Sequence, residues 1–129
     1  MPTVDTNIVL RWLLDDVPEQ TAVAERILNG DTRCVVPDVV LIEAVYVLER
    51  SMLLSRTTVA QSIEAILGLA NLEIHRICWR AALDDYLAHP KVSITDVFLA
   101  AQARDSSALP LYTFDRKLAS QIAGAELAG

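Results

Sequence analysis

The sequence has little of several residue types on which common active sites depend, and each shortage excludes a class of function. Only four of the 129 residues are glycine, and none of them lies in a phosphate-cradling loop of the Walker or GxGxxG kind. No GxSxG motif for a nucleophilic serine is present. The two histidines, His75 and His89, are too few and too far apart for a zinc site with neighbouring cysteine ligands. We expect His75 to be a packed or surface histidine.

Cysteine and positive charge are also scarce. The only cysteines are Cys34 and Cys78, and no signal peptide is recognisable, so we expect two reduced thiols in a cytoplasmic protein, with a disulfide left open. Eleven Lys and Arg residues against 17 Asp and Glu residues give a net charge of −6. This balance argues against a protein that grips nucleic acid through a broad basic face. It is compatible with a nuclease whose bound metal ions supply local positive charge.

Hydrophobic residues, in contrast, are abundant. They make up 53% of the sequence, yet no apolar run approaches the roughly 18 residues that a membrane-spanning helix needs. The length predicts a single domain over residues 1–129, large enough to bury a core without disulfides. We expect the surplus apolar surface to meet another subunit or a partner protein.

Short apolar strands alternate with helical segments along the chain. A strand of a few residues ends at Asp5, and later strands are expected near 33–36, 72–76 and 109–113. One helix or a pair of helices follows each strand. This order, β-α-α-β-α-α-β-α-α-β-α, predicts an α/β fold: a three-layer α/β/α sandwich with a central, mostly parallel sheet of four or five strands.

Carboxylates occur at the boundaries of these elements. Asp5 follows the first strand, Glu43 lies in the helix after the second, Asp96 opens the helix before the last strand, and Asp115 follows that strand. Ligands of open α/β sheets gather at the carboxyl ends of strands, so Asp5 and Asp115 would face each other if the first and last strands are neighbours. The structural alternative is that Asp5, Asp96 and Asp115 only cap helices and that Glu43 faces solvent.

Four short motifs resemble the acidic motifs of the PIN-domain family. They are Val4-Asp5-Thr6-Asn7, Glu43 within residues 41–44, Asp96 within residues 94–100, and Tyr112-Thr113-Phe114-Asp115. Each motif alone is weak evidence, but their order and spacing cover nearly the whole chain. Together with the chain length, they resemble the VapC-type toxins of type II toxin–antitoxin pairs.

The resemblance implies an endoribonuclease that depends on Mg²⁺ or Mn²⁺. Asp5, Glu43, Asp96 and Asp115 would then be the catalytic residues and the metal ligands. Asn7 and Thr113 would support this cluster as polar neighbours. The resemblance also implies a homodimer and a cognate antitoxin that wraps a clip of two helices, near residues 38–54 and 58–68. The chain departs from this family pattern at its end. Many relatives continue into a last strand after the final helix, but here the segment 121–129 is short and rich in small side chains, so a fifth strand is left open.

The chemistry of phosphodiester hydrolysis suits such a cluster. Hard divalent cations activate water and stabilise charge on phosphoryl oxygens, and they prefer oxygen ligands. Two carboxylates about 4 Å apart repel each other by about 4 kcal/mol at an effective dielectric near 20, so four in one crevice favour a bound cation. Arg116 and Lys117 begin the last helix, where the macrodipole disfavours cations. They are candidate phosphate contacts, although a solvated helix end is the simpler explanation.

Two rival hypotheses remain at the level of the sequence. The chain could be a catalytically weak PIN-like module that binds RNA or a protein. It could also be a phosphatase with an aspartate nucleophile after the first strand. Such enzymes usually have a second aspartate two residues further on, where this sequence has Asn7.

Overall fold

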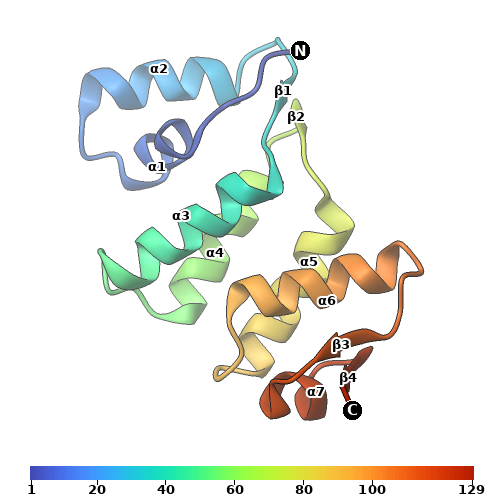
Figure 1. Ribbon diagram of the computed structural model, residues 1–129. Helices are drawn as coiled ribbons and strands as arrows, with labels where there is room; N and C mark the ends of the chain where they lie inside the picture. The colour runs from blue at the N-terminus through green and yellow to red at the C-terminus, as the bar shows by residue number, and fades with distance from the viewer. The chain divides into compact units, whose positions relative to one another are not determined.

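A computed structural model describes all 129 residues, which form two compact units, residues 1–75 and residues 76–129 (Figure 1). The chain has seven helices and four short strands. Their order reproduces the predicted alternation, except that no strand precedes α1 and one further strand follows α7. None of the helices combines the length and the apolar character that crossing a bilayer requires.

The first unit contains four helices and two strands. Its helices α1 and α2 pack together, α3 packs on α1, and α4 packs on α3. The core is made of aliphatic side chains from all four helices, with Leu28, Leu41, Leu48 and Ile63 almost fully buried. In chain order the elements are α1 (Thr6–Leu14), α2 (Pro18–Leu28), β1 (Cys34–Val35), α3 (Asp38–Arg50), α4 (Arg56–Leu67) and β2 (Leu72–Glu73).

The strands of the first unit run parallel. Cys34 pairs with Leu72, and Val35 pairs with Glu73. On its other side Val35 forms a parallel bridge to Thr3, in which the Val4 N–H donates to the Val35 carbonyl at 3.1 Å. The expected first strand is thus a single bridge, because Asp5 turns the chain into α1 immediately afterwards. β1 therefore lies between this bridge and β2, and all of these pairings are parallel, as predicted.

The second unit is built on a pair of packed helices. Trp79 of α5 and Phe98 of α6 place their ring centroids 4.6 Å apart, and Trp79 and Tyr86 are completely buried. Such aromatic pairs add about 0.5–1.5 kcal/mol beyond the burial of their area. In chain order the elements are α5 (Arg76–Ala88), α6 (Ile94–Asp105), β3 (Leu111–Thr113), α7 (Arg116–Gln121) and β4 (Ala125–Leu127).

The open question of a last strand is answered by β4, which pairs in parallel with β3 from Leu111 with Ala125 to Thr113 with Leu127. Gly124 allows this strand to begin, because its φ of +90° is strained for other residues. A Cβ atom at Gly124 would also come within 2.7 Å of the Leu109 side chain. The small residues of 121–129 did not by themselves indicate whether a strand forms there.

Several expected boundaries shift for identifiable reasons. α4 begins at Arg56, before the expected residue 58, because the Ser55 side chain accepts the Thr58 N–H at 3.2 Å and caps the helix. α3 begins at Asp38 as expected, with Pro37 in the cap position and no side-chain bond there. α3 ends at Arg50, four residues earlier than expected, and Leu53 then adopts a φ of +54° that no helix contains.

The α/β class and the parallel strand direction are confirmed. The strands pair as two small parallel sheets, β1 with β2 and β3 with β4. The strand expected over 72–76 ends at Glu73, because α5 begins at Arg76. Both cysteines are free and buried, as expected for reduced thiols.

The α1–α2 pair is held together partly by a carboxylate. The indole Nε1 of Trp12 donates to Glu25, and the Asn29 side-chain amide donates to the same carboxylate at 2.9 Å. The hydrogen bond from Asn29, and then the one from Trp12, hold the pKa of Glu25 below its ordinary value of 4.5. A carboxylate whose pKa is lower in the folded state stabilises the fold at pH values above its unfolded pKa, and this contribution disappears as the pH falls through the folded value.

We therefore predict that Glu25→Gln lowers the melting temperature at pH 7, because a neutral amide accepts these hydrogen bonds less strongly than a carboxylate. The deficit should shrink as the pH falls below 4.5, when Glu25 of the unmodified protein takes up its own proton. Thermal melting of both proteins between pH 3 and pH 7 measures this difference. A deficit of the same size at both ends of the range would contradict the prediction.

Candidate active site

Asp5 lies where the bridged segment at Thr3 passes into α1. Its Oδ1 accepts the Ile8 N–H at 3.1 Å, so the side chain caps the helix, as the structural alternative supposed. Its Oδ2 makes no hydrogen bond or ion pair. The side chain is exposed. Capping therefore uses only one of the two carboxylate oxygens, and the other remains available to a ligand.

A cavity of about 510 Å³ opens beside Asp5. It lies within the first unit, between α1 and α2. Nothing in the sequence pointed to Arg11 or Gln20, because their position depends on how the two helices pack. The lining residues are Asp5, Asn7, Ile8, Arg11, Gln20 and Val23.

Glu43 lies in the middle of α3 with an exposed side chain that makes no hydrogen bond or ion pair. It belongs to the same unit as Asp5, and α3 packs on α1. It is not among the residues that line the Asp5 cavity. The expected alternative, a solvent-facing glutamate on an otherwise apolar helix, describes this position.

Asp96 lies in the first turn of α6, three residues after Ser93. The Ser93 side chain accepts the Asp96 N–H at 3.2 Å, so Ser93, and not Asp96, caps the helix. The Asp96 carboxylate is half-buried and makes no hydrogen bond or ion pair of its own. Its charge is favourably placed near the positive end of the helix dipole, and both of its oxygens remain available.

Asp115 begins α7 directly after β3. Its Oδ1 accepts the N–H groups of Lys117 at 2.9 Å and Leu118 at 3.1 Å, while its Oδ2 has no partner. Thr113 supports this turn, because its hydroxyl oxygen accepts the Asp115 N–H at 2.9 Å. The side chains of Arg116 and Lys117 are exposed beside it.

The four acids thus fall into two pairs, Asp5 and Glu43 in the first unit and Asp96 and Asp115 in the second. Neither unit by itself brings three or more His, Cys, Asp or Glu side chains into a group that could hold a metal ion. The predicted metal site draws on both units and stays a prediction. The donor set nevertheless fits a hard divalent cation, because each of the four carboxylates keeps at least one oxygen without a partner.

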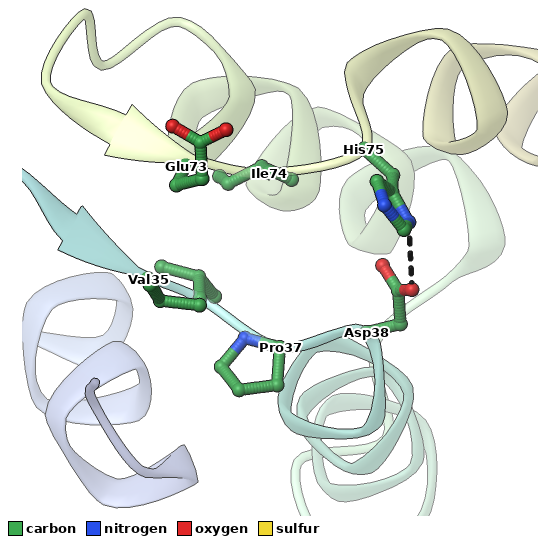
Figure 2. A pocket seen from close by; sticks show the side chains of 7 residues that line it. Val35, Pro37, Asp38, Glu73, Ile74 and His75 are labelled. Atoms are coloured by element: carbon green, nitrogen blue, oxygen red, sulfur yellow. Dashed lines mark hydrogen bonds and ion pairs between the residues drawn. The ribbon is translucent and has the colours of Figure 1, made fainter.

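A second polar feature of the first unit was missed by the sequence reasoning. The His75 ring is hydrogen bonded through Nδ1 to Oδ2 of Asp38 at 2.9 Å, at the edge of a small cavity of about 150 Å³ that Val35, Pro37 and Glu73 also line (Figure 2). β1 and β2 are parallel neighbours, so residues just beyond their ends lie side by side. His75 and Asp38 follow those two strands in the sequence, and this position could have indicated that the two side chains meet.

A match to a known protein family spans almost the whole chain. The sequence matches the PIN domain family over residues 3–124, so the chain belongs to that family. The match extends across both units and includes all four acids. No curated protein matches the sequence.

The PIN domain is a nuclease fold, and its members typically depend on divalent metals. The family match confirms the α/β fold class expected from the order of the elements. It also supports a hydrolase, with carboxylates as the natural ligands. The kind of RNA or DNA, the metal and the biological role are finer questions.

We predict that Asp96→Asn leaves the metal-free protein as stable as the unmodified protein, or more stable. The loss of a favourable helix-dipole interaction is worth about 0.3–1 kcal/mol. Relief of repulsion exceeds this loss if the acids lie close together, since one carboxylate pair at about 4 Å repels by about 4 kcal/mol.

Thermal melting in a chelating buffer tests this prediction. The matched control is Asp105→Asn, which removes an exposed carboxylate at the far end of the same helix. A large loss of stability confined to Asp96→Asn would make the residue structural.

Proposed function

We propose that this protein is a Mg²⁺- or Mn²⁺-dependent endoribonuclease that acts as the toxin of a type II toxin–antitoxin pair, resembling the VapC type. The observation that carries the proposal is the state of the four acidic positions in a chain that belongs to the PIN domain family. Each carboxylate keeps an oxygen without a partner, even where another oxygen of the same group caps a helix. Glu43 and Asp96 cap no helix, so a structural role as caps does not account for these two positions.

In this proposal Asp5, Glu43, Asp96 and Asp115 would hold the metal. When bound, Mg²⁺ or Mn²⁺ supplies a water of lowered pKa and positive charge for the phosphoryl oxygens. The chain supplies the fixed positions of the ligands. Asp5 and Asp115 are each held by their own helix, and Thr113 also fixes the backbone of Asp115. Asn7 shares the cavity with Asp5 and would orient that carboxylate or the substrate beside it.

We assign the partner surface to the clip formed by α3, α4 and the turn between them. Val39 at the start of α3 is exposed by 67%, and Met52 and Leu53 in the turn after α3 are exposed by 45% and 82%. Exposed apolar side chains of this kind favour contact with a partner. A homodimer and a cognate antitoxin are the partners that this surface would serve. A cytoplasmic location follows from the proposed substrate, cellular RNA.

The first test is cleavage of a mixed cellular RNA pool by the purified, antitoxin-free protein in Mg²⁺, in Mn²⁺ and in chelator. We expect metal-dependent cleavage, and we expect Asp96→Asn to abolish it because a metal ligand is lost. Asp105→Asn should cleave normally. Absence of cleavage in both metals by a folded sample would falsify the nuclease proposal and favour a binding module. Turnover of a simple aryl phosphate would point to a phosphatase.

A second test concerns Arg116 and Lys117, which we assign to substrate phosphates on either side of the cleaved bond. Changing both to Ala should raise KM for RNA about tenfold, since each contact of an exposed cation with a phosphate is worth roughly 0.2–1 kcal/mol and about 1.4 kcal/mol corresponds to a factor of ten. The salt dependence of binding should weaken by about one unit of slope per lost contact. Cleavage kinetics at several salt concentrations measure both effects. Unchanged kinetics would mean that Arg116 and Lys117 only form a solvated helix end and do not contact the substrate.

A further inference from the structure

The cavity between α1 and α2 has the construction of a binding site. Each helix contributes side chains spaced by three or four residues, which lie on one face of a helix. From α1 these are Asn7, Ile8 and Arg11, and from α2 they are Gln20 and Val23. The volume of about 510 Å³ falls in the range of about 300–1,000 Å³ that is usual for small-ligand pockets.

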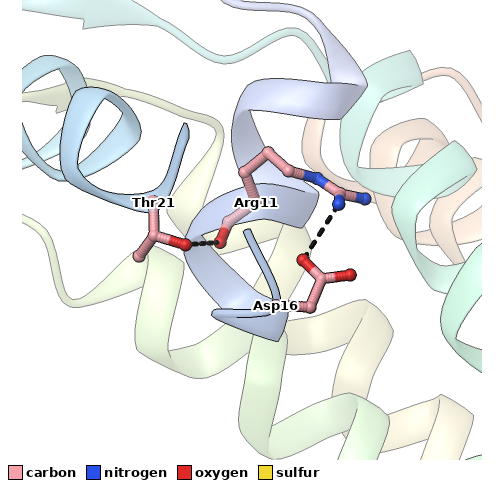
Figure 3. A network of polar contacts seen from close by, with 3 residues as sticks. All are labelled: Arg11, Asp16 and Thr21. Carbon is pink, nitrogen blue, oxygen red and sulfur yellow. Dashed lines mark hydrogen bonds and ion pairs between the residues drawn. The ribbon is translucent and has the colours of Figure 1, made fainter. Parts of the chain in front are cut away.

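The two walls of this cavity are tied together. The Thr21 hydroxyl donates to the Arg11 carbonyl at 3.1 Å, which joins the start of α2 to α1 (Figure 3). Trp12 and Glu25 form a second link between the same helices. Asp15 ends α1 in the left-handed region, with a φ of +48°, and so sets the sharp turn between them. A site whose walls are fixed in advance loses less conformational entropy when a ligand binds.

The lining chemistry matches one nucleotide of an RNA strand. Arg11 offers a guanidinium group for a phosphate, which it can bind in bidentate fashion. Gln20 offers an amide that can both donate to and accept from the edge of a base. Ile8 and Val23 offer apolar surface for the base itself. Asp5, a proposed metal ligand, lines the same cavity, so a nucleotide held here would lie next to the reacting phosphate.

We propose that this cavity is a nucleotide subsite that helps to set where RNA is cut. Arg11 binds a phosphate next to the cleaved bond, and Gln20 reads the base that follows. The inference rests on the proposed ribonuclease function and adds two residues that the acidic motifs do not contain. It names single-stranded RNA as the occupant, because the bases of a duplex are not free to enter a cavity of this kind.

Asp16 adjusts the strength of this subsite. Its Oδ1 lies 2.9 Å from Nη1 of Arg11, and the two side chains are 48% and 23% exposed (Figure 3). An incoming phosphate must therefore share the guanidinium group with Asp16 or replace it. Removing the Asp16 charge should strengthen RNA binding through Arg11 and through no other residue, and this dependence can be tested directly.

The experiment measures binding of fluorescent single-stranded RNA oligonucleotides by anisotropy in Mg²⁺, with every variant made in the Asp96→Asn background to prevent cleavage. Arg11→Gln should weaken binding about tenfold for all sequences and reduce the salt slope by about 1. Arg11→Lys should retain part of the affinity. The matched control is Arg26→Gln, which removes an exposed charge of α2 outside the cavity.

Two further variants sharpen the test. Asp16→Asn should tighten binding when Arg11 is present and have no effect in the Arg11→Gln protein. Gln20→Leu should leave the salt slope unchanged and relax the preference for one base, which sequencing of the products from otherwise unmodified enzyme would show.

The inference is overturned if Arg11→Gln behaves like Arg26→Gln, or if Asp16→Asn tightens binding equally without Arg11. The first of these results would mean that RNA does not occupy the cavity and would favour a protein partner as its ligand. Cleavage by the unmodified enzyme decides the proposed function separately, since that enzyme can cut RNA whether or not Arg11 contributes. Melting curves for each variant confirm that the fold is intact.

Discussion

The arrangement of this protein depends on one interaction used twice, a carboxylate that ends an extended segment and caps the helix that follows. Asp5 holds α1 through one oxygen, and Asp115 holds α7 in the same way. Each cap satisfies backbone N–H groups that a helix end leaves without partners. Because one oxygen is fixed to the helix, the direction of the other is fixed as well. Structural and chemical roles are therefore not alternatives at these positions, since a single side chain can fill both.

The hairpin of α1 and α2 also fixes a side chain that belongs to none of the acidic motifs. Arg11 is fixed at its backbone by Thr21 and at its side chain by Asp16. These bonds give a surface cation a defined position beside Asp5, whereas most arginines on a helix sample many rotamers. The net charge of −6 makes such placement important for the proposed RNA substrate, because an acidic chain gains little from general attraction to phosphates.

Local signals predicted the class and direction of most elements. The α/β order, the parallel direction of the strands and the helix starts after Asp5 and Asp115 followed from short apolar runs that end in capping residues. Features set by packing were not predictable in this way. The strand after Gly124 depends on its pairing with Leu111–Thr113. The Arg11 cavity and the contact between His75 and Asp38 likewise require two elements to be placed side by side. The cap at Ser55 and the early end of α3 are set by contacts within a few residues, and they were nevertheless not predicted.

The capping geometry of Asp5 has an evolutionary consequence. Asparagine caps helices about as well as aspartate, because its side-chain oxygen accepts the same hydrogen bond. A single-base change in the codon is enough to make this exchange. The variant would keep its helix and its core while losing the negative charge that the proposed metal site uses. If that proposal holds, inactive copies can arise in one step and persist as folded proteins.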